Sequence, residues 1–127
     1  MSDDIVGFLR ARLDEDEAAA LDAEGSCPSP WEGSADLWDG SGDPIAADTD
    51  RNYVTVRGAE HIARHDPARV LRDVEAGRAI VDMHADCGSG VGYCDDGGHG
   101  GDGSCGTLCY LAAVYSDHPD YRLEWKP

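Results

Sequence analysis

Apolar side chains recur at helical spacing over the first 24 residues of the chain. Ile5, Phe8, Leu9 and Leu13 follow one another at intervals that place them on one side of a helix, and Ser2 precedes them as a capping residue. The acidic run at 14–17 falls on or beside the outer face. This pattern predicts an N-terminal helix over residues 1–24.

Residues 25–57 are rich in glycine, serine, proline and aspartate, but they also contain Trp31 and Trp38. Because a tryptophan buries a large area when it packs, we expect short strands and loops laid on a core. The four residues 53–56 alternate at period two and are the best candidate for a strand. We therefore expect a small antiparallel sheet in this region.

A helical segment is predicted over residues 58–85, beginning with a short helical turn. Asp66 followed by Pro67 then marks the start of a long helix, because aspartate caps the first turn and proline needs no hydrogen bond at the first position. Gly77 inside this helix indicates a close helix crossing.

Residues 106–127 predict a third helix and a C-terminal tail. We expect the tail to pack back on the domain, because Tyr121 and Trp125 are too large to leave in solvent. Together these patterns predict a single α+β domain over residues 1–127. It has three main helices, a small antiparallel sheet and a cysteine-rich loop over 86–109 that holds zinc.

The net charge of −16 is spread unevenly. Residues 1–50 carry fourteen acids against two arginines, whereas residues 51–85 carry six arginines against five acids. A strongly negative field repels nucleic-acid phosphates, so we do not expect direct nucleic-acid binding. The opening MSDDIVGF lacks the pattern of a leader, and the longest uncharged apolar run, 110–115, is too short to span a bilayer. We expect a soluble, cytoplasmic protein without membrane contact.

The most unusual stretch is 84–109, with four cysteines, two histidines and nine glycines. In a cytoplasmic chain the five cysteines stay reduced, so a disulfide framework is not expected. Ordering each residue costs about 1–2 kcal/mol, and this stretch has few large apolar side chains to offset that cost. A bound metal would supply the missing folding free energy.

Thiolates and imidazoles are the ligands that zinc prefers, and four protein ligands make a closed structural site. The spacing puts two cysteines one turn apart at the start of the third helix and a histidine and a cysteine at the end of the second. The alternatives are a glycine loop with reduced, unligated cysteines, and a redox role. The predicted zinc ligands are Cys87, Cys94, Cys105 and Cys109, with His84 and His99 as substitutes.

Two other patterns point to metal chemistry less directly. The sequence His84-Ala85-Asp86 with two later cysteines is similar to zinc deaminases, but it lacks their glutamate and their Pro-Cys-x-x-Cys motif. His61 and His65, at i and i+4, are interpreted as packing or capping residues rather than as a second metal pair.

The stretches EHIARHDPARVLRDVEAGRAIVDMH (60–84) and LAAVYSDHPDYRLEWKP (111–127) resemble a family of small uncharacterised proteins of actinobacteria and their phages, a domain of unknown function. The N-terminal helix and the turn CPSPW at 27–31 fit the same family, although Ser29 stands where relatives have glycine. More remotely, the layout is similar to accessory proteins of phage early regions. The resemblance implies no activity, but relatives often carry cysteines between the last two helices.

We expect a non-catalytic accessory or interaction module that binds a protein partner and is stabilised by structural zinc. An acidic inhibitor that imitates DNA to block a nucleic-acid enzyme is the alternative. A zinc-dependent hydrolase or deaminase-like enzyme is the third hypothesis.

Overall fold

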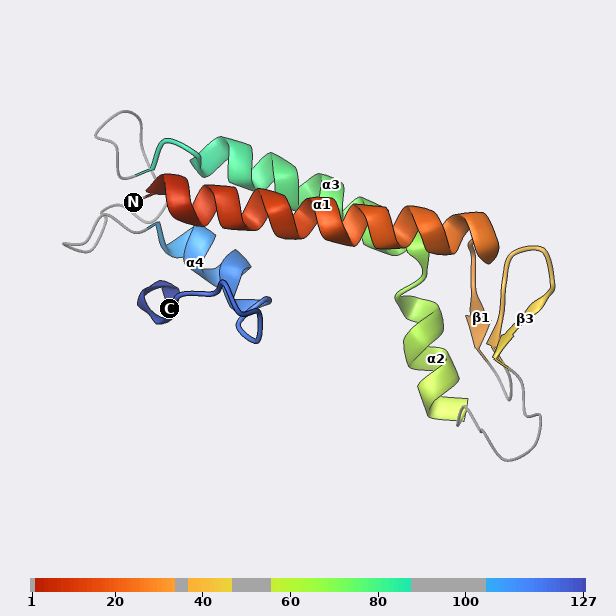
Figure 1. The fold of residues 1–127 in the computed structure, drawn as a ribbon. Helices are drawn as coiled ribbons and strands as arrows, with labels where there is room; N and C mark the ends of the chain where they lie inside the picture. The colour runs from red at the N-terminus through yellow and green to blue at the C-terminus, as the bar shows by residue number, and fades with distance from the viewer. Residues whose placement is uncertain (1, 34–36, 47–55, 88–104) are drawn as a thin grey trace. The chain divides into compact units, whose positions relative to one another are not determined.

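The computed structural model describes residues 2–33, 37–46, 56–87 and 105–127. Within these ranges the chain forms four α-helices, a three-stranded antiparallel sheet and a short 3₁₀ helix, which confirms the predicted α+β class (Figure 1). The elements in chain order are α1 (Ser2–Ser26), β1 (Glu32–Gly33), β2 (Leu37–Trp38), β3 (Pro44–Ala46), α2 (Val56–Arg64), α3 (Pro67–His84), α4 (Gly106–Ala113) and η1 (Leu123–Trp125).

The chain divides into two compact units. The first unit comprises Met1–Glu15 and Glu75–Pro127, and the second comprises Asp16–Val74. Both boundaries fall inside helices, so α1 and α3 each contribute one end to each unit. The assignment of residues 1–127 to a single domain stays a prediction.

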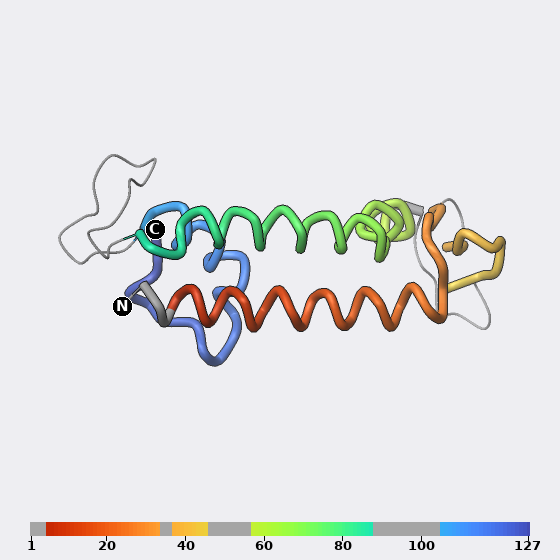
Figure 2. Tube along the Cα trace, turned by 90° about the horizontal axis from the view of Figure 1, so that it is seen from above, coloured from red at the N-terminus to blue at the C-terminus, as the bar shows by residue number. Residues whose placement is uncertain are grey.

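In the first unit, α1 and α3 run antiparallel and side by side (Figure 2). Arg10 Nη2 lies 3.2 Å from Asp82 Oδ1, and Arg78 Nη2 lies 2.7 Å from Asp14 Oδ1. The two helices approach closely at the buried Gly77, where an added Cβ would lie 3.1 Å from a methyl carbon of Leu13. The close crossing predicted from this glycine is therefore confirmed.

Phe8 of α1 is the centre of an aromatic cluster that holds the C-terminal tail of the first unit. Its ring centroid lies 5.0 Å from that of Trp125 and 6.2 Å from that of Tyr121. Trp125 is only 5% exposed. The predicted packing of the tail on the domain is confirmed, because aromatic surface of this size is stable only when it is buried. The guanidinium of Arg12 lies over the same Phe8 ring, and Arg12 also contacts His118.

In the second unit the sheet order is β1-β2-β3, with Gly33 opposite Leu37 and Leu37 opposite Ala46. Helix α2 packs on β1, and the contact is closest at Gly33. An added Cβ at this glycine would lie 2.2 Å from the backbone oxygen of Ala59, so only glycine fits. The buried Leu37, 1% exposed, anchors the central strand.

The turn between β2 and β3 is built around the buried carboxylate of Asp39. Its Oδ1 accepts hydrogen bonds from the backbone N–H of Asp43 and from the N–H and hydroxyl of Ser41, each at 2.9 Å. These bonds, that from Asp43 above all, hold the pKa of Asp39 below its usual value, although burial acts in the opposite direction. Gly42 has φ of 85°, a conformation that favours glycine.

The start of α3 has the predicted chemistry. Asp66 Oδ1 accepts a hydrogen bond from the backbone N–H of Arg69 at 2.9 Å, and Pro67 is the first helical residue. By contrast, the predicted strand over 53–56 is not confirmed at its last residue, because Val56 begins helix α2. Its other three residues lie outside the described ranges.

None of the described helices combines the length and the apolar composition that a bilayer crossing requires.

Candidate metal site

The C-terminal end of α3 carries the first two residues of the candidate site. His84 is the last residue of the helix, and Cys87 follows it after one turn. The backbone N–H of Cys87 donates to the carbonyl oxygen of His84 at 3.0 Å. This local turn brings an imidazole and a thiol to the same side of the helix end.

The N-terminal end of α4 carries the third residue. Cys105 occupies the N-cap position with an extended backbone, φ −82° and ψ 122°. Its carbonyl oxygen accepts the first helical hydrogen bond, from the N–H of Cys109 at 3.0 Å. Cys105 makes no side-chain capping hydrogen bond, although the N-cap position is usually occupied by a residue that does.

These three side chains meet in the interior of the first unit. Nδ1 of His84 lies 3.4 Å from the Sγ of Cys87 and 3.4 Å from the Sγ of Cys105. All three ligand atoms lie within 4.8 Å of one another. His84 is 5% exposed, Cys87 7% and Cys105 1%.

The spacing of these atoms fits a tetrahedral metal. With Zn–S bonds of about 2.3 Å and Zn–N bonds of about 2.0 Å, the edge from nitrogen to sulfur of a tetrahedron is about 3.5 Å. The two observed nitrogen–sulfur distances are close to this value. The three side chains therefore form a buried group that could hold a metal ion.

The structure brings together two of the four predicted ligands and one of the two substitutes. Cys87 and Cys105 are members of the group, and His84 is the substitute that joins them. Cys109 is also buried, one helical turn after Cys105, but it is not one of the three clustered residues. The remaining two candidates, Cys94 and His99, lie outside the described residues. The complete ligand set stays a prediction.

The sequence predicts His84 only as a substitute for one of the cysteine ligands. The useful signal is its spacing from Cys87: a separation of three residues at a helix terminus places both side chains on one side of the turn. The sequence contains this signal, but only the position of Cys105 shows that it belongs to the site.

His61 and His65 are arranged differently from the buried group of His84, Cys87 and Cys105. The ring centroids of His61 and His65 are 4.6 Å apart, and Nδ1 of His65 lies 2.8 Å from the carbonyl oxygen of His61. With Nδ1 protonated, His65 donates to this carbonyl near the end of α2. Both side chains are exposed. Within the described ranges these two histidines have no third ligand group close enough to complete a metal cluster.

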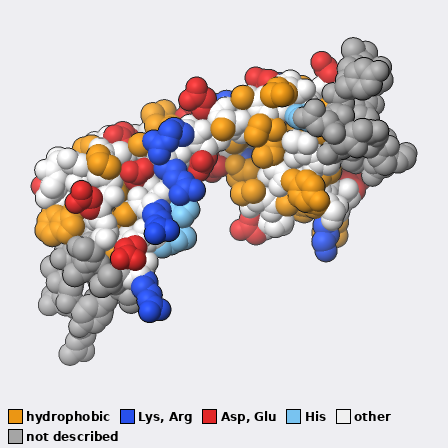
Figure 3. All heavy atoms as spheres, turned by 180° about the vertical axis from the view of Figure 1, so that it is seen from behind, with side chains coloured by type: hydrophobic (Ala, Val, Ile, Leu, Met, Phe, Trp, Pro, Cys, Tyr) orange, Lys and Arg blue, Asp and Glu red, His pale blue; other side chains and the backbone are white. Residues whose placement is uncertain are grey.

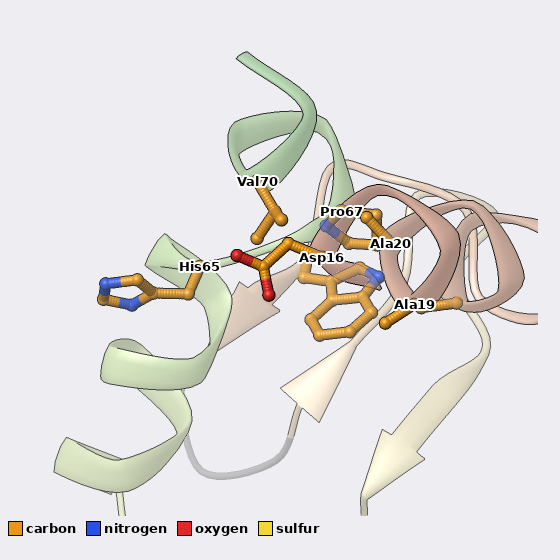
Figure 4. A pocket seen from close by; sticks show the side chains of 8 residues that line it. Asp16, Ala19, Ala20, His65, Pro67 and Val70 are labelled. Carbon is orange, nitrogen blue, oxygen red and sulfur yellow. The ribbon is translucent and has the colours of Figure 1, made fainter. Parts of the chain in front are cut away.

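A hollow of about 220 Å³ lies in the second unit (Figure 4). Ala19 and Ala20 of α1 and Pro67 and Val70 of α3 give it mainly apolar walls, and Asp16 adds a carboxylate. Its full lining is Asp16, Ala19, Ala20, Ala23, Trp31, His65, Pro67 and Val70. The hollow is the size of one amino-acid side chain rather than of a cofactor, because cofactor and drug sites measure about 300–1,000 Å³.

The fold and the buried group define a small α+β protein with a possible His/Cys/Cys metal site. The chain matches the model of a family of unknown function (DUF6221) over residues 2–127, and it therefore belongs to this family. No curated protein and no solved structure gave a significant match. The resemblance to a domain of unknown function is confirmed, whereas the link to actinobacteria and their phages stays a prediction.

Proposed function

We propose that this protein is a small accessory module for protein–protein interaction, held in shape by a structural zinc ion. The main support for a metal is that one imidazole and two thiols from two helix ends meet in a buried position. The two nitrogen–sulfur distances between them match the edge of a tetrahedral zinc site. Thiolate and imidazole ligands favour zinc over hard cations such as magnesium and calcium. In the cytoplasm, where we place the protein, the thiols would remain reduced.

A fourth protein ligand would make the site structural rather than catalytic. We propose Cys94 or Cys109 for this role, with His99 as the substitute, in keeping with the predicted set. A closed site of four protein ligands leaves no position for a reactive water. Three protein ligands and one water would instead favour the zinc-enzyme hypothesis.

The interaction role is supported by apolar surface on the first unit. Tyr110 is 69% exposed and Leu123 is 85% exposed. Both side chains, with Tyr121 and Lys126, line a groove of about 580 Å³ beside α4 and η1. These exposed apolar side chains gather in one groove, and we propose that this groove contributes to contact with a protein partner.

The metal is tested by elemental analysis of protein purified under reducing conditions without chelator. We expect about one zinc ion per chain, and we expect Cys105→Ser to lose it. Cys27→Ser is the matched control, because Cys27 belongs to the second unit and is not a member of the buried group. Substitution by cobalt(II) then counts thiolate ligands through the sulfur-to-cobalt charge-transfer band, and X-ray absorption shows whether a water completes the coordination. A metal-free wild type, or equal metal loss in both variants, would refute the zinc site.

The acidic surface supports the DNA-mimic as a second candidate. The net charge is −16, and Asp14, Glu15 and Asp22 are exposed along α1. A mimic should displace labelled DNA from a basic DNA-binding protein, and failure to do so even at low salt would exclude this function.

A further inference from the structure

Basic side chains gather on one face of the second unit, over α2 and the start of α3 (Figure 3). Arg57, His61 and Arg64 are all exposed, and their spacing of i, i+4 and i+7 places them on one face of α2. The exposed Arg69 and Arg72 follow at the start of α3, three residues apart. Nη1 of Arg69 donates to the carbonyl oxygen of Arg64 at 3.3 Å, which joins the two groups. We name these five residues the arginine stripe.

The stripe differs from the rest of this acidic chain in its ion pairing. Within the described residues, Arg57, Arg64 and Arg72 form no ion pair, and Arg69 Nε is 3.8 Å from Asp73 Oδ2. Described arginines outside the stripe do have acidic partners: Arg10 with Asp82, Arg12 with Glu15, Arg78 with Asp14, and Arg122 with Glu124. Three arginines of the stripe therefore keep their charge available, although acids outnumber bases 26 to 10 in the chain.

The apolar hollow of the second unit begins where the stripe passes from α2 to α3. His65 lines the hollow, and its ring centroid lies 4.6 Å from that of His61, a member of the stripe. Pro67 and Val70 line the hollow from the same turns of α3 that carry Arg69. In Figure 4 the imidazole of His65 points away from Pro67 and Val70. A cationic surface and an apolar hollow are thus neighbours within one unit.

We propose that the arginine stripe and the adjoining hollow bind a short acidic segment of a protein partner, with one apolar side chain of that segment seated in the hollow. Arg57 and Arg64 are seven residues apart, about 10 Å along a helix. An extended peptide covers this distance in about three residues, so carboxylates at alternate positions can reach successive arginines. The inference rests on the proposed interaction role and is independent of the metal.

Three observations favour an acidic protein segment over nucleic acid. A long polyanion would run beyond the stripe into a chain of net charge −16, whereas a short segment would not. Asp16 lines the hollow, so the group seated there should be uncharged, as an aliphatic side chain is and a phosphate is not. The alanine, proline and valine walls suit an aliphatic side chain, and the hollow has a single indole, that of Trp31, whereas single-strand binders stack successive bases on a series of aromatic side chains.

The experiment measures fluorescence anisotropy of a labelled peptide with glutamates on both sides of a central leucine, in about 50 mM salt to limit screening. The test variant is R57Q/R64Q/R72Q. The matched control, R10Q/R78Q/R122Q, removes the same charge from paired arginines of the first unit. The single variant Arg64→Gln is included in case the triple variant is poorly folded. Thermal unfolding and zinc content are measured on every sample.

We expect the wild type to bind the peptide and the stripe variant to lose about tenfold in affinity, which is what three exposed ion pairs supply together. The control should change less than about twofold, apart from the general effect of charge. Replacing the central leucine by serine should also weaken binding. Absence of peptide binding, or an equal loss in both triple variants, would overturn the inference while the zinc content leaves the metal proposal standing. Tighter binding of a ten-nucleotide single strand through the same arginines would overturn the choice of partner.

Discussion

Removal of the proposed zinc should destabilise the first unit by an amount that its geometry allows us to calculate. The ion would cross-link Cys87 to Cys105, which are about 18 residues apart. In the limit where the ion stays bound to both cysteines of the unfolded chain, closing a loop of this length destabilises that chain by about 3 kcal/mol at 25 °C through its lost entropy. Zinc that binds only the folded protein at a concentration about 1,000 times its Kd contributes about 4 kcal/mol, a similar value.

Thermal unfolding before and after chelation measures this quantity. For a chain of this size, a loss of about 3 kcal/mol lowers the Tm by roughly 10 °C. Cys105→Ser should show the same decrease without chelator, because its Sγ is one of the three clustered ligand atoms and is nearly inaccessible to solvent. Cys27→Ser should keep the wild-type response to chelation, since Cys27 is outside the site.

A chelated sample that has lost its zinc but keeps its Tm would refute the structural role of the metal. The outcome would then favour a metal that binds without holding the fold together. Recovery of the Tm on adding zinc back is also required, because it separates metal loss from irreversible oxidation of the thiols that lose their metal.

Three further substitutions test the packing of the rest of the chain by equilibrium unfolding. Gly33→Ala should destabilise the protein by about 1–3 kcal/mol, because its Cβ would overlap the Ala59 backbone; an unchanged Tm would contradict this close approach. Gly7→Ala should stabilise α1 by up to about 1 kcal/mol, since nothing lies within 4 Å of the added carbon, and a lower Tm would contradict that open environment. Asp39→Asn should destabilise the protein at neutral pH, and the difference from wild type should disappear in acid. The wild-type carboxylate, whose folded pKa is lowered chiefly by the Asp43 N–H, stabilises above the unfolded pKa of about 3.9 and loses this effect as the pH falls through the folded pKa. A difference that persists unchanged into acid would contradict this assignment.

Local signals predicted the helices well. The Asp66-Pro67 start of α3 depends on one capping carboxylate and one proline, and both act within a single turn. The apolar stripe of α1 likewise needs no long-range information, and its members Phe8 and Leu9 are buried. Signals of this kind are reliable because the residues that decide the structure are neighbours in the sequence.

The strands were harder to predict from local sequence signals. The three strands have only two or three residues each, so a period of two cannot be recognised within them. The period-two run over 53–56 is contradicted only at its last residue, because Val56 begins α2, and its other residues lie outside the described ranges. The sheet depends instead on a tertiary contact, that of Gly33 with the Ala59 backbone, which no local pattern indicates.

The candidate site depends partly on local sequence signals and partly on tertiary contacts. The stretch 84–109 was recognised because its composition is unusual, and its members Cys87 and Cys105 do meet. The choice among six donors could not be made from spacing, since it depends on which helix ends lie together in three dimensions. His84 joins the group because α3 ends at that residue and its Nδ1 lies 3.4 Å from each of the two sulfur atoms.

The positions of these donors at helix ends also favour a bound cation and ionised thiols. His84 lies at the C-terminal end of α3, where the partial negative charge of the backbone carbonyls stabilises a bound cation. Cys105 lies at the N-terminal end of α4, where unpaired N–H groups stabilise a thiolate. Each effect contributes about 0.3–1 kcal/mol. Cys105 thus stands where a serine or aspartate would normally cap the helix, and its lack of a capping hydrogen bond is consistent with a sulfur directed at a metal rather than at its own backbone.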